Sequence, residues 1–166
     1  MGTVSHAHIS GAALLQLEAS ARSQGSGISA EDLEGCWRLR QVWSKGSSHP
    51  AAASSWMLGS LQAQLRISRK AAGLVLGNSV QLGALELRFT GPAELRGKRP
   101  LLQFWFERLE LRLAQQVIWS RSLGKPEQRR VPFFALIARE PTGWLAARGR
   151  GGGLALWERL EAAESN

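Results

Sequence analysis

Histidine and cysteine, the residues that most often hold metals or attack substrates, are scarce in this chain. The single cysteine is Cys36, and the three histidines are His6, His8 and His49. One cysteine excludes an internal disulfide and a structural zinc site of the usual Cys/His type. His6 and His8 stand among small residues without a neighbouring carboxylate, and His49 stands in a Ser/Ala-rich stretch. We therefore expect no metal site.

Motifs of established catalytic use are also missing from the sequence. It contains no His-Glu-x-x-His, no Gly-x-Ser-x-Gly and no Ser-His-Asp spacing. The run 148–153 lacks the Gly-Lys-Ser/Thr ending of a phosphate-binding loop, and a hairpin turn explains its glycines. Cys36 beside Arg38 could have a lowered thiol pKa, but a packing role fits it better. The sequence predicts a protein that is not an enzyme and that has no catalytic residues and no cofactor.

Tryptophan and arginine are the abundant functional types. The 166 residues include seven Trp and five Phe but no Tyr, and 17 of the 21 basic residues are Arg. Seven indoles is a high number for one domain of this size, so several of them must be buried or lie against a ligand. The net charge of +8 favours anionic partners such as nucleic acid, lipid headgroups or an acidic protein. The alternative is that the arginines only solvate the surface.

Apolar and polar residues alternate with period two over most of the chain after residue 35, which predicts strands. In the first of them Trp37, Leu39 and Trp43 are expected to share one face. Turn signals at Gly77-Asn78 and Gly91-Pro92 predict chain reversals there, with a basic loop over 91–100. The predicted strands are 36–43, 61–69, 73–76, 80–89, 101–113 with a register change near 107–108, 117–119, 133–138, 144–148 and 154–157.

Helices are expected only near the N-terminus. Residues 11–23 have the apolar spacing of a short amphipathic helix, and Ser29 followed by Asp32 predicts one further helical turn. A helix over 103–115 is a weaker alternative to the strand. Many short strands joined by turns indicate a barrel or a sandwich. We expect an N-terminal tail and helical segment (1–34), a β domain (35–160) and a C-terminal tail (161–166).

No apolar run reaches the roughly 18 residues that a membrane helix needs, and the N-terminus lacks the features of a secretory signal. The sequence thus predicts an intracellular protein that is not secreted and has no transmembrane helix. Its positive charge makes an anionic membrane surface a possible partner.

Three stretches carry a resemblance to a known family. The triplet Gly35-Cys36-Trp37 matches the Gly-x-Trp that begins calycin barrels, the superfamily of lipocalins. Together with 77–111 and 143–160 it resembles the plastid lipid-associated proteins, or fibrillins, of chloroplasts and cyanobacteria. The family's closing Arg-Gly motif is matched by Leu145, Arg148, Gly149, Gly151 and Leu154.

The chain departs from that motif in two places. Thr142 to Leu145 stand where the family has Thr-Tyr-Leu-Asp, so the acidic residue is missing. Ala146 replaces the first arginine. The resemblance spans about 35–160. It implies a mostly β, antiparallel lipocalin-like (calycin) barrel of about eight strands, which binds a lipid or other apolar metabolite at photosynthetic (thylakoid) membranes.

An eight-stranded barrel can hold one small ligand or be filled by its own side chains, and both possibilities remain open. We expect a ligand to enter at the end formed by loop 44–55 and hairpin 148–153. Trp37 and Arg159 should form the structural pair that closes the barrel, because antiparallel end strands bring them together. The predicted ligand-binding residues are Trp43, Trp56, Phe104, Phe106, Trp144, Arg148 and Arg150.

Two other functions fit the same features. A bilin chromophore lyase of the calycin type would use the apolar interior for a linear tetrapyrrole. A basic nucleic-acid-binding barrel would use the arginines, although we regard nucleic acid as an unlikely partner.

Overall fold

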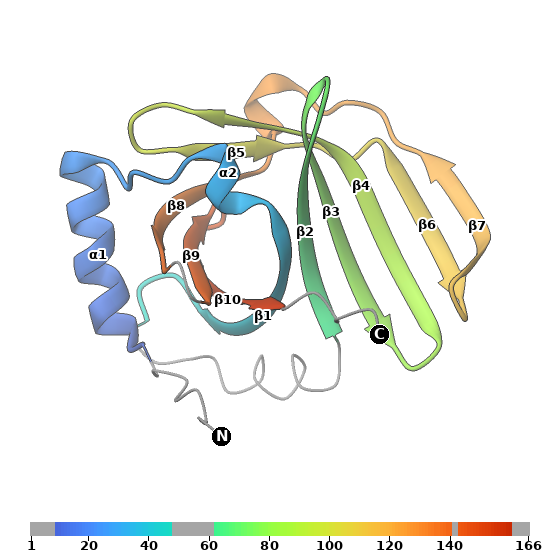
Figure 1. Ribbon diagram of the computed structural model, residues 1–166, viewed down its shortest axis with the longest axis horizontal. Helices are drawn as coiled ribbons and strands as arrows, with labels where there is room; N and C mark the ends of the chain where they lie inside the picture. The colour runs from blue at the N-terminus through green and yellow to red at the C-terminus, as the bar shows by residue number, and fades with distance from the viewer. Residues whose placement is uncertain (1–8, 48–61, 141–142, 161–166) are drawn as a thin grey trace.

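The computed structural model describes residues 9–47, 62–140 and 143–160. In this part of the chain, two helices precede ten strands that form one antiparallel sheet (Figure 1). The helices are α1 (Gly11–Gln24) and α2 (Ala30–Leu33), and a 3-10 turn, η1, covers Gln128–Arg130. The strands are β1 (Gly35–Trp43), β2 (Gln62–Lys70), β3 (Gly73–Leu82), β4 (Leu85–Arg96), β5 (Leu101–Phe104), β6 (Arg108–Leu113), β7 (Gln116–Ser122), β8 (Phe133–Arg139), β9 (Trp144–Gly149) and β10 (Leu154–Leu160).

Eight of these strands close into a barrel. The pairings run β1, β2, β3, β4, β5, β8, β9, β10 and back to β1, so the sheet has no open edge around this ring. Figure 1 shows the ring with α2 over one end and α1 against its outside. The predicted mostly β, antiparallel, calycin-like barrel with a short N-terminal helix is therefore confirmed.

The two remaining strands extend the sheet beyond the barrel. The C-terminal part of β4 (93–96) pairs with β5 inside the ring, whereas its N-terminal part (85–90) pairs with β6. β6 in turn pairs with β7, which lies at the far margin of the molecule (Figure 1). We call residues 77–90 and 108–122 the wing.

The wing separates from the barrel where β5 and β6 are interrupted at 105–107. There the Trp105 amide donates to the Pro92 carbonyl (3.3 Å) and the Glu107 amide donates to the Thr90 carbonyl (2.9 Å). A Cβ on Gly91 would lie only 1.9 Å from the Trp105 carbonyl oxygen. Glycine is therefore required at this position so that the two backbones can approach each other. The predicted register change near 107–108 corresponds to this interruption.

Two predicted chain reversals were wrong. β4 runs through Gly91-Pro92 to Arg96, so residues 91–96 are strand and not loop. β3 likewise runs unbroken through Gly77-Asn78, and the chain turns at Gly83, whose φ is +59°. A glycine within a strand can be needed for close packing or for the space that a missing side chain leaves. In the sequence it looks the same as a glycine needed for a turn.

Aromatic and aliphatic side chains fill the barrel. Trp37 is fully buried, and its indole nitrogen donates to the Leu33 carbonyl (2.9 Å), so α2 closes that end. A chain of rings with centroids 5.1 to 5.5 Å apart extends through the core. Its members, in order of contact, are Phe89, Phe106, Phe104, Phe134 and Trp157.

Candidate functional site

The predicted ligand-binding residues do not lie in one place, and a bulge in β1 is the first reason. Between Leu39 and Gln41 the pairing of β1 with β10 shifts by one residue. Trp37 lies in the barrel core, whereas Trp43 packs outside the barrel in the second core under α1, with Leu14. The prediction that Trp37 and Trp43 share a face was wrong, because a bulge moves every later side chain to the opposite face.

The other predicted residues are divided by the barrel wall. Phe104 and Phe106 lie inside, while Trp144 packs with Trp43 in the second core. Arg150 is exposed, and its guanidinium donates to the Arg129 backbone carbonyl. Trp56 lies outside the described residues.

Arg148 is bound to α1 rather than free for a ligand. Its Nε and Nη2 atoms donate to the two carboxylate oxygens of Glu18 at 2.6 and 2.5 Å. Arg99 and Arg22 each donate to the same carboxylate at 3.1 Å. The Glu18 side chain is only 3% exposed, and the hydrogen bonds from Arg148 hold the pKa of its carboxyl below the usual value. This cluster attaches α1 to the barrel.

Arg159 lies where the strand geometry places it. It pairs in register with Trp37, and its guanidinium carbon is 5.5 Å from the centre of that indole ring. Arg159 also donates to the Glu34 carbonyl (3.0 Å). The pair ties the last strand to the first and has a structural role.

One face of the wing presents an open apolar surface, which we call the apolar wing face. Cross-strand pairing places Leu82, Leu85 and Leu113 in one row at the tip of the wing. Their exposed fractions are 59, 43 and 47%. The next row consists of Val80, Leu87, Leu111 and Trp119, and the third contains Asn78, Phe89, Leu109 and Arg121.

The apolar wing face continues into the barrel core. Phe89 lies on this face and is the outermost ring of the aromatic chain, where it contacts Phe106. At the other end, Trp119 on the marginal strand β7 is 49% exposed. The surface thus runs from the edge of the molecule to the mouth of the barrel. Large exposed apolar surfaces on soluble domains mark interaction sites.

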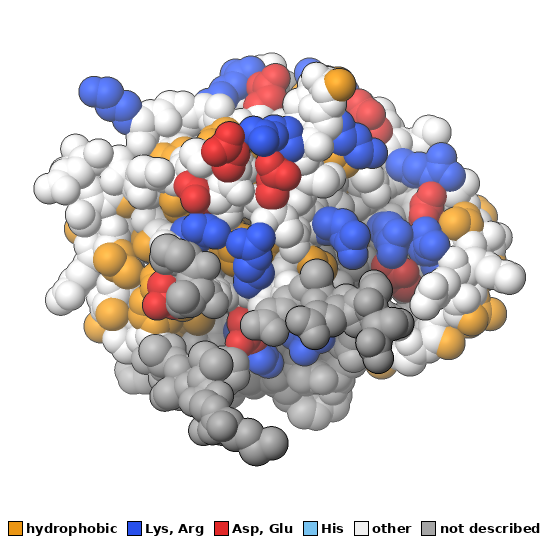
Figure 2. All heavy atoms as spheres, in the orientation of Figure 1, with side chains coloured by type: hydrophobic (Ala, Val, Ile, Leu, Met, Phe, Trp, Pro, Cys, Tyr) orange, Lys and Arg blue, Asp and Glu red, His pale blue; other side chains and the backbone are white. Residues whose placement is uncertain are grey.

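The opposite face of the wing, the charged wing face, is hollowed into a groove of about 710 Å³ along β3. Val75, Gly77 and Ser79 of β3 form its floor, and residues of β2, β4 and β6, among them Arg66, Arg88 and Arg112, form its walls. Figure 2 shows Lys and Arg side chains gathered over this part of the molecule. A second hollow of about 480 Å³ adjoins it over β4 and β6, and Arg88 and Arg112 line both.

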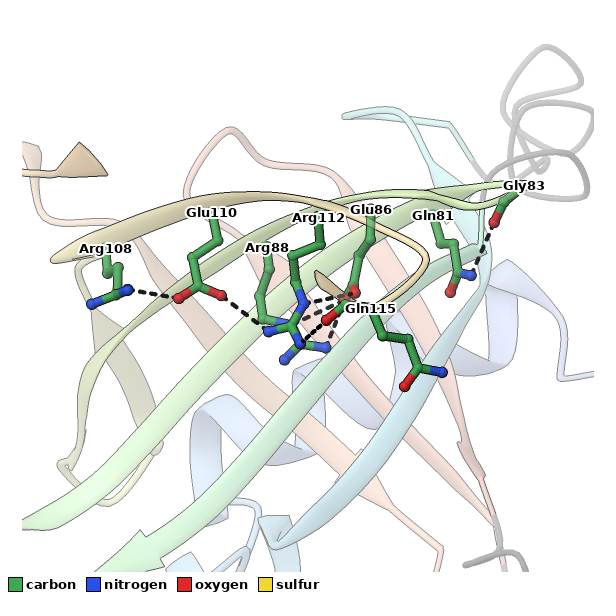
Figure 3. Close-up of polar contacts among 8 residues, drawn as sticks. All are labelled: Gln81, Gly83, Glu86, Arg88, Arg108, Glu110, Arg112 and Gln115. Atoms are coloured by element: carbon green, nitrogen blue, oxygen red, sulfur yellow. Dashed lines mark hydrogen bonds and ion pairs between the residues drawn. The ribbon is translucent and has the colours of Figure 1, made fainter. Parts of the chain in front are cut away.

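Alternating charges order the β4–β6 wall of the groove. Glu110 contacts Arg108 (2.7 Å) and Arg112 (3.2 Å), and Glu86 contacts Arg88 (2.8 Å), with Arg112 at 3.8 Å. Figure 3 shows these side chains on one side of the sheet, pointing toward one another. Burial acts to raise the pKa of the Glu110 carboxyl, but the hydrogen bonds from its two arginines outweigh burial and lower the pKa.

Sequence reasoning missed both wing faces. Leu85, Leu87 and Phe89 alternate with polar residues in the predicted strand 80–89, but such a pattern does not show whether the apolar side is covered. Leu82 and Leu85 flank the turn at Gly83, and their exposure follows from the pairing of this end of β4 with β6 outside the ring.

Comparisons with known proteins find similarity to solved structures. No protein-family model and no curated protein matches the chain. A solved structure described as "REP1-NXSQ fatty acid transporter" is similar at a TM-score of 0.37 and 10% sequence identity, covering 80% of this chain and 99% of that chain. No helix among the described residues is long and apolar enough to cross a bilayer. Within the same residues, no group of three or more His, Cys, Asp or Glu side chains could hold a metal ion.

Proposed function

We propose that this chain is a noncatalytic protein that binds a lipid or another apolar metabolite, and that the ligand lies on the apolar wing face. The observation that carries the proposal is the row of exposed leucines at the wing tip, Leu82, Leu85 and Leu113, backed by the row that ends at Trp119. Burying apolar surface contributes roughly 25 cal/mol per Å², so a long hydrocarbon chain over two such rows would be held without any polar contact.

The barrel interior is a poorer place for this ligand than the sequence led us to expect. Trp37 and the chain from Phe106 to Trp157 occupy the core, and displacing such rings would cost several kcal/mol. The apolar wing face needs no such displacement. Its third row ends in Arg121, opposite Leu109, which offers a cation for the carboxylate or phosphate of an amphipathic lipid.

The proposal includes the family resemblance and the location it implies. A fibrillin-type protein would work peripherally at photosynthetic membranes. The wing tip carries no charged residue, which suits contact with the apolar part of a lipid surface. The net charge of +8 on the whole chain favours an anionic lipid surface. The tip combines two adjacent turns, since the Ala114 amide donates to the Ala84 carbonyl (2.9 Å).

A fluorescent fatty acid tests the proposal. We expect cis-parinaric acid to gain fluorescence with the parent protein, and Leu85→Lys to weaken its binding at least tenfold. The matched control is Leu15→Lys, because Leu15 on α1 is 42% exposed and Leu85 is 43% exposed. Both variants gain one positive charge. Equal affinities for the two variants, or no binding by the parent, would contradict the proposal.

A further inference from the structure

We infer that the groove on the charged wing face binds an acidic segment of another polypeptide. This site is separate from the proposed lipid site, because alternate residues of β4 point to opposite sides of the sheet. Leu85 and Leu87 lie on the apolar wing face, whereas Glu86 and Arg88 line the groove.

The groove lies along β3 because the residues of β3 that face it are small. Val75, Gly77 and Ser79 face the groove from β3, and Gly77 has no side chain at its middle. Arg66 pairs with Gly77 from β2 and Thr90 pairs with it from β4, so larger groups stand on either side of the gap. The result is a trough along β3 that suits an extended chain.

The two walls differ in how their cations are used. On the β4–β6 wall, Arg112 is occupied by Glu110 and by the Gln115 carbonyl (2.7 Å), and Arg88 is paired with Glu86. On the β2 wall, Arg66 and Lys70 are exposed and lie within ion-pair distance of no carboxylate among the described residues. These two cations are therefore available to an incoming anion.

The lining favours a peptide over a nucleic acid. Single-stranded nucleic acids are held largely by bases stacked on aromatic rings, and none of the residues that line the groove is aromatic. Glu86 lies within the groove and would repel a chain of phosphates. A polypeptide can interact with groups of both charges. Its amides can donate hydrogen bonds to Glu86, and its acidic side chains can form ion pairs with Arg66 and Lys70. The side-chain amides of Gln64 and Gln81 can bond to the peptide backbone.

The spacing of the free cations sets the spacing of acids in the partner. Arg66 and Lys70 are four residues apart on one strand, which is about 13 Å. In an extended peptide, acidic residues at positions i and i+4 are the same distance apart and point the same way.

Fluorescence anisotropy with a labelled ten-residue peptide tests this inference. The peptide carries an acid at every fourth position, and a second peptide carries the corresponding amides. We expect the parent protein to bind the acidic peptide and the double variant Arg66→Glu/Lys70→Glu to bind it at least tenfold more weakly. The control is Arg129→Glu/Arg130→Glu, which changes the net charge equally at a distant exposed turn, with side chains 86 and 75% exposed. Its affinity should change less than threefold.

Three results would overturn the inference. They are failure of the acidic peptide to bind, an equal loss in both double variants, and tighter binding of an oligothymidylate of the same charge than of the peptide. Binding of cis-parinaric acid by Arg66→Glu/Lys70→Glu should stay as in the parent. Failure of the peptide site therefore leaves the lipid site intact, and the reverse also holds.

Discussion

The barrel and the wing share strands β3 and β4 but differ in what covers their inward face. Ala93, in the barrel part of β4, is 5% exposed, whereas Leu85, on the same face of the same strand, is 43% exposed. The difference arises at 105–107, where β5 continues toward β8 and β6 toward β7. Closure turns one half of β4 into core, and the lack of closure leaves the other half exposed to solvent.

This contrast separates residues that hold the fold from residues of the proposed lipid site. In the barrel, removing an inward side chain leaves a cavity among packed neighbours. In the wing, removing one takes away contact surface that solvent already reaches. The same type of substitution should therefore change stability in one region and binding in the other.

Trp37→Ala should have the largest effect. Trp37 is fully buried, donates to the Leu33 carbonyl and stacks with Arg159, so truncation should lower the free energy of unfolding by about 3–5 kcal/mol. Thermal and urea denaturation would show the loss. An unchanged midpoint would remove Trp37 from the core and contradict the account of the barrel.

Gly91→Ala tests the junction between the two regions. The new Cβ would meet the Trp105 carbonyl oxygen at 1.9 Å, and backbone atoms cannot move aside cheaply. Because β4 would have to shift against residues 105–107, we expect the free energy of unfolding to fall by about 2–3 kcal/mol. Gly124→Ala is the control, because a Cβ at Gly124 meets nothing within 4 Å and its φ is not positive. Equal stability of the two variants would show that the close approach at Gly91 is not needed.

Glu18→Gln tests the attachment of α1 and adds a pH dependence. In this variant the partner of Arg148 would be an uncharged amide. We therefore expect the free energy of unfolding to fall by about 1–2 kcal/mol at pH 7. The folded-state pKa of Glu18 lies below the ordinary 4.5, so its contribution is complete above pH 4.5 and is lost as the pH falls through the lowered value. The difference in unfolding free energy between parent and variant should therefore shrink in acid. A difference that is the same at pH 7 and pH 3 would contradict the assignment.

Trp119→Ala should have the smallest effect on stability, within about 0.5 kcal/mol, because the indole is 49% exposed on the outermost strand. The same variant should bind cis-parinaric acid several-fold more weakly than the parent. A marked drop in melting temperature together with unchanged fatty-acid binding would reverse the roles assigned to barrel and wing.

Much of the fold was predictable from particular residues. Gly35-Cys36-Trp37 marked the start of the first strand, and Ser29 with Asp32 marked α2, where both capping hydrogen bonds are present. The two glycines at 77 and 91 were misinterpreted, because a glycine needed for a groove floor or for close approach looks the same in sequence as one needed for a turn. Only the paired strand reveals which role it has.

The candidate site was much less predictable. The extra residue in β1 near Arg40 has no sequence signal, yet it moves Trp43 out of the barrel. The engagement of Arg148 by Glu18 joins residues 130 positions apart, which no local pattern shows. The exposure of Leu85 and Leu113 depends on β6 leaving the ring, which is a property of the whole sheet.

Hydrogen exchange of the full chain, with and without oleate, tests the central claim most directly because it locates the ligand without any substitution. The account predicts slower exchange of backbone amides in 82–85 and 108–122 when oleate is added, and unchanged exchange in 44–47 and 149–153. Protection confined to 44–47 and 149–153, or to the barrel strands with none in the wing, would contradict it.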